Sequence, residues 1–217
     1  MPTLVIGNKN YSSWSLRPWL LLRQFGVAFD ERRIPLDTPQ FHDEIRQWSP
    51  SGRVPVLHDD GLVVWDTLAI CEYANERWLD GRGWPRDVAA RAQARSAAAE
   101  MHSGFGALRA QLPMQCDRVP RAGRWDAAAQ ADIDRMQALW RQLRSDHGGD
   151  GRFLCGAFGI VDAMFAPVAI RFRGFGVALD AVCAAYCEAL HALPALQEWI
   201  AAACVESERL PDVDRIA

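Results

Sequence analysis

Hydrophobic and polar residues alternate in two different ways along this chain of 217 residues, and the change falls near residue 80. Before it, short apolar runs alternate with segments in which apolar residues recur every three or four positions, as strands alternating with helices do. After it, alanine-rich segments with helical periodicity follow one another without a strand between them. The pattern predicts a mixed α+β unit followed by an all-helical unit.

The first unit contains four strand-like and three helix-like segments in the order β-α-β-α-β-β-α. The predicted strands are 3–7, 28–36, 54–58 and 62–65, and the predicted helices are 16–26, 40–49 and 66–79. The tripeptide Asp59-Asp60-Gly61 indicates a hairpin turn between the last two strands, because glycine tolerates a positive φ.

The segment DGRGWPRD at 80–87 is the strongest linker candidate, since it holds two glycines and a proline. Beyond it the pattern predicts helices at 87–110, 126–146, 160–173, 180–191 and 194–206. We therefore expect a first domain at 1–80, a linker at 81–87 and an all-helical domain at 88–217.

The net charge, the hydropathy and the cysteine pattern argue against several classes of binding partner. With 24 basic and 27 acidic residues the net charge is −3, so we expect neither nucleic acid nor a membrane surface as a partner. The apolar runs are too short to cross a bilayer, and MPTLVIGNKN lacks the basic and apolar regions of a secretory signal, which predicts a cytoplasmic protein. The six cysteines form no CxxC pair and no zinc-like cluster with histidine, so we expect no metal.

Three short segments carry a family resemblance. NKNYSSWSLRPWLLL at 8–22 sets three serines around a tryptophan, RVPVL at 53–57 begins the third strand with a proline, and DTLAICEYANERW at 66–78 opens the third helix. This order resembles the thioredoxin fold, in which that proline is cis. With the helical second unit, the whole chain resembles a cytosolic glutathione transferase. The serine stretch is similar to the SSCSWR signature of the zeta class and to serine-type bacterial members.

The resemblance implies that glutathione is a co-substrate and attacks as its thiolate. A thiol has a pKa near ~8.5, and lowering it by about two units takes roughly 2.7 kcal/mol of preference for the anion. A helix N-terminus contributes roughly 0.3–1 kcal/mol and a hydroxyl hydrogen bond to the charged sulfur roughly 1.5–3 kcal/mol. Alignment on Arg17 favours Ser12 as the hydroxyl donor, with Ser13 as the alternative, and Ser15 is expected to be the helix N-cap. The simpler interpretation is that all three serines only cap the helix and form the turn.

The resemblance also implies a binding site for the rest of glutathione. Asp66 is expected to pair with the γ-glutamyl ammonium group, while Thr67 and neighbouring amides receive the carboxylate. Val54, which precedes Pro55, resembles the residue whose backbone pairs with the cysteinyl amide. The polar residues proposed to reach the glycine carboxylate are Gln40, His42 and Arg53. The alternative for Asp66 and Thr67 is an ordinary helix cap.

A hydrophobic electrophile is expected to bind between the two units, against the first long helix of the second unit. The predicted lining residues are Trp14, Met101, His102 and Phe105. Core packing is the competing interpretation for Met101 and Phe105, and His102 alone does not indicate a catalytic base.

The segment FGIVDAMFAPVAIRF resembles the N-capping box of the family's helical domain. Asp162 stands at the third helical position, but the cap position is Gly159, which has no side chain, so only half of the box is expected. The departure concerns the start of one helix and leaves the predicted fold unchanged.

The leading hypothesis is a homodimeric glutathione transferase, with a detoxification role, that stabilises the glutathione thiolate and conjugates it to an electrophile. A zeta-like cis-trans isomerase of the maleylacetoacetate type is the first alternative, although Trp14 stands where zeta members have cysteine. A non-catalytic binding protein with the same fold is the second. A thiol reductase is disfavoured, because residues 8–17 contain no cysteine.

Overall fold

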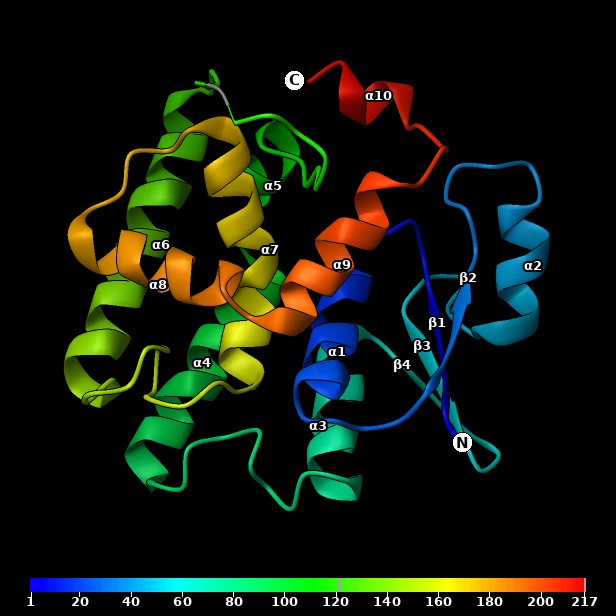
Figure 1. Cartoon of the computed structure of the whole chain (residues 1–217), viewed down its shortest axis with the longest axis horizontal. Coiled ribbons are helices and arrows are strands. Elements are labelled where there is room, and N and C mark those ends of the chain that lie inside the picture. Colours follow the sequence, from blue (N-terminus) through cyan, green and yellow to red (C-terminus); the bar gives the residue numbers. More distant parts are fainter. Residues whose placement is uncertain (121, 217) are drawn as a thin grey trace.

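A four-stranded mixed sheet forms the first part of the chain in the computed structural model, which describes residues 1–120 and 122–216 (Figure 1). Strand β1 (Thr3–Ile6) pairs in parallel with β2 (Asp30–Arg33) and antiparallel with β3 (Val56–Asp59). Strand β4 (Leu62–Trp65) completes the order β2-β1-β3-β4. The predicted hairpin is present, because Asp60 and Gly61 both have positive φ between β3 and β4.

Three helices cover the two faces of this sheet. Helices α1 (Ser13–Gln24) and α3 (Thr67–Arg77) lie on the face toward the helical part, and α2 (Phe41–Trp48) lies on the opposite face (Figure 1). Side chains alternate along β1 accordingly, since Leu4 and Ile6 join the main core whereas Val5 packs in the small core beneath α2. The predicted thioredoxin-like arrangement is confirmed.

The rest of the described chain is helical. Its elements are α4 (Val88–Ser103), α5 (Gly106–Gln111), α6 (Ala127–His147), α7 (Ile160–Phe175), α8 (Ala181–His191), α9 (Pro194–Cys204) and α10 (Pro211–Asp214). Helix α7 is buried around nearly its whole circumference and packs against α1, α4 and α8, as a helix apolar on all sides must. The predicted all-helical second part is confirmed.

Two boundaries differ from the sequence prediction. The helix expected at 87–110 is broken, because Phe105 adopts a left-handed conformation with φ of 56° between α4 and α5. The first helix begins at Ser13, three residues earlier than expected, so Ser15 lies inside it and Ser12 occupies the N-cap position. The prediction that Ser15 caps α1 is therefore wrong.

The start of α7 is held by a buried carboxylate. Asp162 Oδ2 accepts the amide hydrogen of Gly159 at 2.9 Å, and Oδ1 accepts those of the Leu154 amide and the Tyr186 hydroxyl, each at 3.1 Å. Burial raises the pKa of Asp162 from 3.8 to about 7, against the opposing effect of these hydrogen bonds. One half of the capping box is thus present, as its sequence indicates.

None of the helices in the described residues has both the length and the apolar character needed to cross a membrane. Within 1–120 and 122–216, no three His, Cys, Asp or Glu side chains gather closely enough to hold a metal ion. The six cysteines are free thiols.

Candidate active site

A cavity of about 550 Å³ lies where the loop before β3, the start of α3 and the end of α4 meet. Seven of the residues predicted from sequence line it: Trp14, Arg53, Val54, Pro55, Asp66, Thr67 and His102. They come from both parts of the chain, since Trp14 belongs to α1 and His102 to α4. The cavity is therefore an interdomain site.

Four other predicted residues lie elsewhere. Met101 and Phe105 are buried in the main core, because neighbouring positions on a helix point about 100° apart and His102, not Met101, faces the cavity. Their assignment to the electrophile pocket is wrong. Gln40 and His42 stand at the start of α2, and neither is among the residues that line the cavity.

The two candidate serines differ in their hydroxyl contacts. Ser12 donates its hydroxyl hydrogen to Ser15 Oγ at 2.8 Å, and the same oxygen accepts the amide hydrogen of Gly7 at 3.1 Å. The Ser13 hydroxyl has no hydrogen-bond partner within residues 1–120 and 122–216. Both side chains are buried at the start of α1, directly before the cavity-lining Trp14, and neither lines the cavity itself.

Asp66 has three structural features at the cavity: a backbone with positive φ, a side chain that caps α3 and a contact with His102. Its backbone has φ of 77°, a conformation that costs a residue with a side chain on the order of 1–3 kcal/mol. As the N-cap of α3 it accepts the amide hydrogens of Leu68 and Ala69 on Oδ1. Its Oδ2 lies 3.3 Å from His102 Nε2, which joins α3 to α4 across the domain interface. A strained, charged residue in a cavity is a candidate ligand-binding group.

Thr67 and Val54 present different groups to the site. The Thr67 hydroxyl donates to the backbone carbonyl of Trp14 at 2.6 Å, so its hydrogen fastens α3 to α1 rather than facing a ligand. The Val54–Pro55 peptide bond is cis, as the resemblance predicts. No backbone hydrogen bond of Val54 occurs in the described residues, which leaves its amide and carbonyl available to a peptide ligand.

Trp14 is surrounded by basic side chains. Its ring centroid lies 4.1 Å from Arg17 Cζ, 5.1 Å from Arg109 Cζ and 5.3 Å from the His102 ring. Arg17 is fully buried and donates to the carbonyls of Ser13 and Met164. Burial lowers the pKa of Arg17 to about 9, and repulsion from Arg171 and Arg109 adds to this effect.

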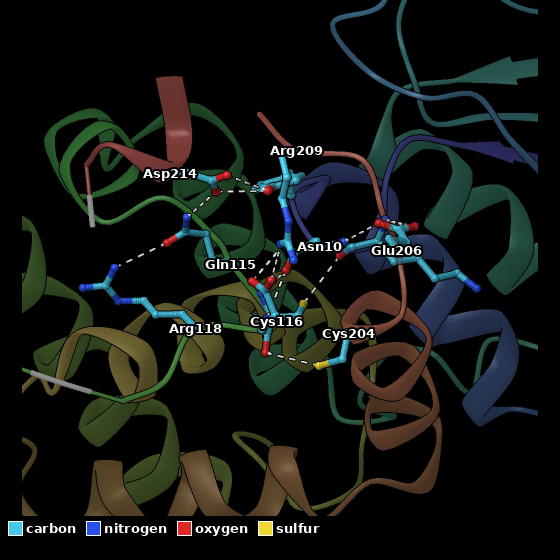
Figure 2. Close-up of polar contacts among 11 residues, drawn as sticks. Asn10, Gln115, Cys116, Arg118, Cys204, Glu206, Arg209 and Asp214 are labelled. Atoms are coloured by element: carbon cyan, nitrogen blue, oxygen red, sulfur yellow. Dashed lines mark hydrogen bonds and ion pairs between the residues drawn. The ribbon is translucent and has the colours of Figure 1, made fainter. Parts of the chain in front are cut away.

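The loop before α1 is held by the C-terminal segment. Glu206 accepts the amide hydrogens of Lys9 and Asn10 at 2.8 and 3.1 Å (Figure 2). Asn10 in turn binds the segment at 115–118, where its Oδ1 accepts the amide hydrogens of Cys116 and Asp117. Residues more than 100 positions apart therefore fix the loop that carries the candidate serines.

The C-terminal helix adds a further anchor to the same loop. The Tyr11 hydroxyl donates to Asp214 at 3.0 Å, and the Gln115 side-chain amide donates to the same carboxylate at 2.9 Å. Figure 2 shows Asp214 and Gln115 facing each other beside Arg209, which pairs with Asp117. This loop before α1, the serine loop at 7–12, is thus held in place by a hydrogen-bond network that the sequence did not predict.

Three cavity residues were missed from the sequence: Ser51, Trp65 and Arg109. Ser51 and Trp65 flank predicted site residues in the sequence, so their proximity could have indicated them. Arg109 gave no such signal, because one arginine in an alanine-rich helical segment has the pattern of a solvent-exposed residue.

The fold and the cavity together define a class of protein: a thioredoxin-like domain and a helical domain with a site between them. Residues 11–77 match the glutathione S-transferase N-terminal domain, and residues 86–202 match the glutathione S-transferase C-terminal domain. The chain belongs to the glutathione S-transferase family.

Individual relatives agree with this assignment. A probable maleylacetoacetate isomerase from Caenorhabditis elegans is 28% identical over 148 residues, which cover 68% of each chain. A glutathione transferase homologue from Burkholderia GL BGR1, solved with bound glutathione, superposes with a TM-score of 0.71 at 23% identity and covers 93% of this chain and 97% of its own. The unclassified 2 glutathione S-transferase from Bombyx mori gives a TM-score of 0.73 at 16% identity, covering 99% and 97%.

Proposed function

We propose that this protein binds glutathione in the interdomain cavity, stabilises its thiolate and transfers it to an electrophilic small molecule. The observation that carries the proposal is the convergence in one cavity of Asp66, the open backbone of Val54 and Trp14, the residue that follows Ser13 in α1. The glutathione bound to the Burkholderia structure supports the choice of ligand.

Each part of glutathione has a candidate partner in this cavity. The Asp66 carboxylate pairs with the γ-glutamyl ammonium group, and the Thr67 amide, which Asp66 does not cap, receives the adjacent carboxylate. The Val54 backbone pairs with the cysteinyl amide as an added strand would. Arg53 lies in the same cavity and is the remaining candidate for the glycine carboxylate, since Gln40 and His42 do not line it.

The thiolate is stabilised by a serine hydroxyl at the start of α1. The sequence favoured Ser12, but that hydroxyl already donates to Ser15. Ser13 has its hydrogen available, so we assign it as the donor. One charge-assisted hydrogen bond of roughly 1.5–3 kcal/mol, together with the helix N-terminus at up to ~2 kcal/mol, supplies the roughly 2.7 kcal/mol required for a two-unit fall in the thiol pKa.

Titration calorimetry with glutathione tests the proposal most directly. We expect saturable binding below millimolar concentration, followed by turnover of an aryl halide such as 1-chloro-2,4-dinitrobenzene. Absence of binding at millimolar glutathione would favour the non-catalytic alternative, in which the same fold serves only to bind another partner.

An isomerase of the zeta type is a second candidate, and the maleylacetoacetate isomerase relative supports it. The same thiolate would add to a cis double bond and leave after rotation, with no net consumption of glutathione. Cis-trans conversion of maleylacetone with constant glutathione concentration would support the isomerase, whereas loss of free thiol with an aryl halide would support the transferase.

The assembly, location and role of the protein remain part of the proposal. A homodimer is the assembly that the family resemblance implies. Light scattering on the purified protein measures its mass in solution directly. The cytoplasmic location and the detoxification role stay predictions.

A further inference from the structure

Part of the cavity wall is formed by aromatic and basic side chains. Trp14, His102 and Arg109 form this wall, and the sequence predicted a hydrophobic surface in this place. Met101 and Phe105, which would have made it apolar, are buried in the core instead. The chemistry of the wall is therefore aromatic and cationic.

The Arg109 guanidinium has no anionic partner in residues 1–120 and 122–216. Its Nε atom is buried and has no hydrogen-bond partner among these residues. Two of its charged neighbours are cations, since Arg109 repels both Arg17 and Arg171. A buried donor without a partner and a cluster of like charges both disfavour the empty cavity relative to one that holds an anion.

The acidic residue of the cavity does not compensate this charge. Asp66 directs Oδ1 to the amides of Leu68 and Ala69, and its Oδ2 lies against His102 Nε2. Asp66 is also the residue that the proposed function assigns to the ammonium group of glutathione. The positive charge of Arg109 is thus left for the second substrate.

Arg109 lies near the start of α1, where the proposed function places the sulfur of glutathione. Trp14 directly follows Ser13, and Arg109 Cζ lies 5.1 Å from the Trp14 ring centroid. A group held by Arg109 would therefore lie beside the start of α1, where the sulfur is stabilised. This inference rests on the proposed function.

We propose that Arg109 binds a carboxylate of the second substrate, so that this enzyme acts on anionic electrophiles in preference to neutral ones. His102 borders the same wall, and its Nε2 lies against Asp66 Oδ2. The substrate class is an acceptor with a carboxylate placed a few bonds from the carbon that sulfur attacks.

The test uses two product-like ligands that differ in one charge: S-(4-carboxybenzyl)glutathione and S-(4-carbamoylbenzyl)glutathione. Titration calorimetry on the wild-type protein is expected to give a dissociation constant about tenfold lower for the carboxylate, the size of one charge-assisted hydrogen bond. Equal affinities in the wild type would overturn the inference while leaving the proposed function intact. No binding of glutathione or either derivative would overturn both.

Substitution assigns the preference to a residue. Arg109→Gln is expected to bring the two ligands within about twofold of each other with glutathione affinity unchanged, and Arg109→Lys is expected to retain part of the preference. Arg152→Gln removes the same charge from an exposed loop and serves as the matched control. If Arg109→Gln weakens glutathione as much as the carboxylate ligand, Arg109 belongs to the glutathione site and the inference fails.

Discussion

The Ser12 hydroxyl donates a hydrogen bond to Ser15 Oγ at 2.8 Å. This contact takes the hydrogen that a thiolate would need from Ser12, and it leaves Ser13 as the serine with a free donor before Trp14. Under the proposed function, the two neighbouring hydroxyls would have separable roles, one in the structure of the turn and one in chemistry.

Single substitutions distinguish these roles. Ser13→Ala is expected to lower kcat/KM for an aryl halide by roughly ten- to a hundredfold, because one charge-assisted hydrogen bond of about 1.5–3 kcal/mol is lost. The pKa of bound glutathione, followed by the ultraviolet absorbance of its thiolate against pH, should rise in the same variant. Ser12→Ala should change both quantities less. The reverse order would restore Ser12 as the donor, and full activity in both variants would eliminate the hydroxyl mechanism.

Asp66 is expected to affect binding through charge and stability through capping. Asp66→Asn keeps an oxygen for the amides of Leu68 and Ala69 but removes the charge, so glutathione affinity should fall about tenfold or more with little change in thermal stability. Asp66→Ala should in addition lose about 1 kcal/mol of stability from the lost cap. Calorimetric titration and thermal denaturation measure the two effects. Unchanged glutathione affinity in Asp66→Asn would remove Asp66 from the site.

Glu206 is expected to position the serine loop without touching a substrate. Glu206→Ala leaves the amides of Lys9 and Asn10 without their acceptor, at a cost of roughly 1–3 kcal/mol for each that stays buried. We expect lower stability, a severalfold fall in kcat and a raised pKa of bound glutathione, with KM little changed. Glu208→Ala, which removes only the ion pair with Arg33, is the control. An unshifted pKa of bound glutathione would reduce Glu206 to a structural role.

Asp162 should give the protein a stability term that depends on pH. Burial raises the pKa of folded Asp162 to about 7 from an ordinary value of 3.8. The folded state then holds a proton that the unfolded state releases above about pH 4, so this contribution is fully present below pH 4 and is lost as the pH rises toward 7. Urea denaturation of wild type and Asp162→Asn at several pH values should show the wild type losing its relative advantage between pH 4 and 7. Parallel stability curves would show that Asp162 does not titrate in this range.

Much of the fold follows from local rules that the sequence displays. The short apolar run of β1, the Asp60-Gly61 turn and the periodic helices each depend on residues close together in the chain, so their positions could be read directly. The ends of helices were harder to predict. Ser15 has a side chain typical of a cap, but it lies inside α1 and accepts the amide hydrogen of Gly7 instead. A cap is decided by where the helix begins, and tertiary contacts set that point.

The sequence by itself determined the family, the order of elements and the part of the cavity lining that lies on short motifs, at Val54, Pro55, Asp66 and Thr67. Only the tertiary structure decided which neighbour on α4 faces the cavity, His102 or Met101, since apolar core and apolar pocket residues share one pattern. It also brought Arg109 to Trp14 and Glu206 to Asn10. These contacts join residues far apart in the chain, and no local propensity encodes them.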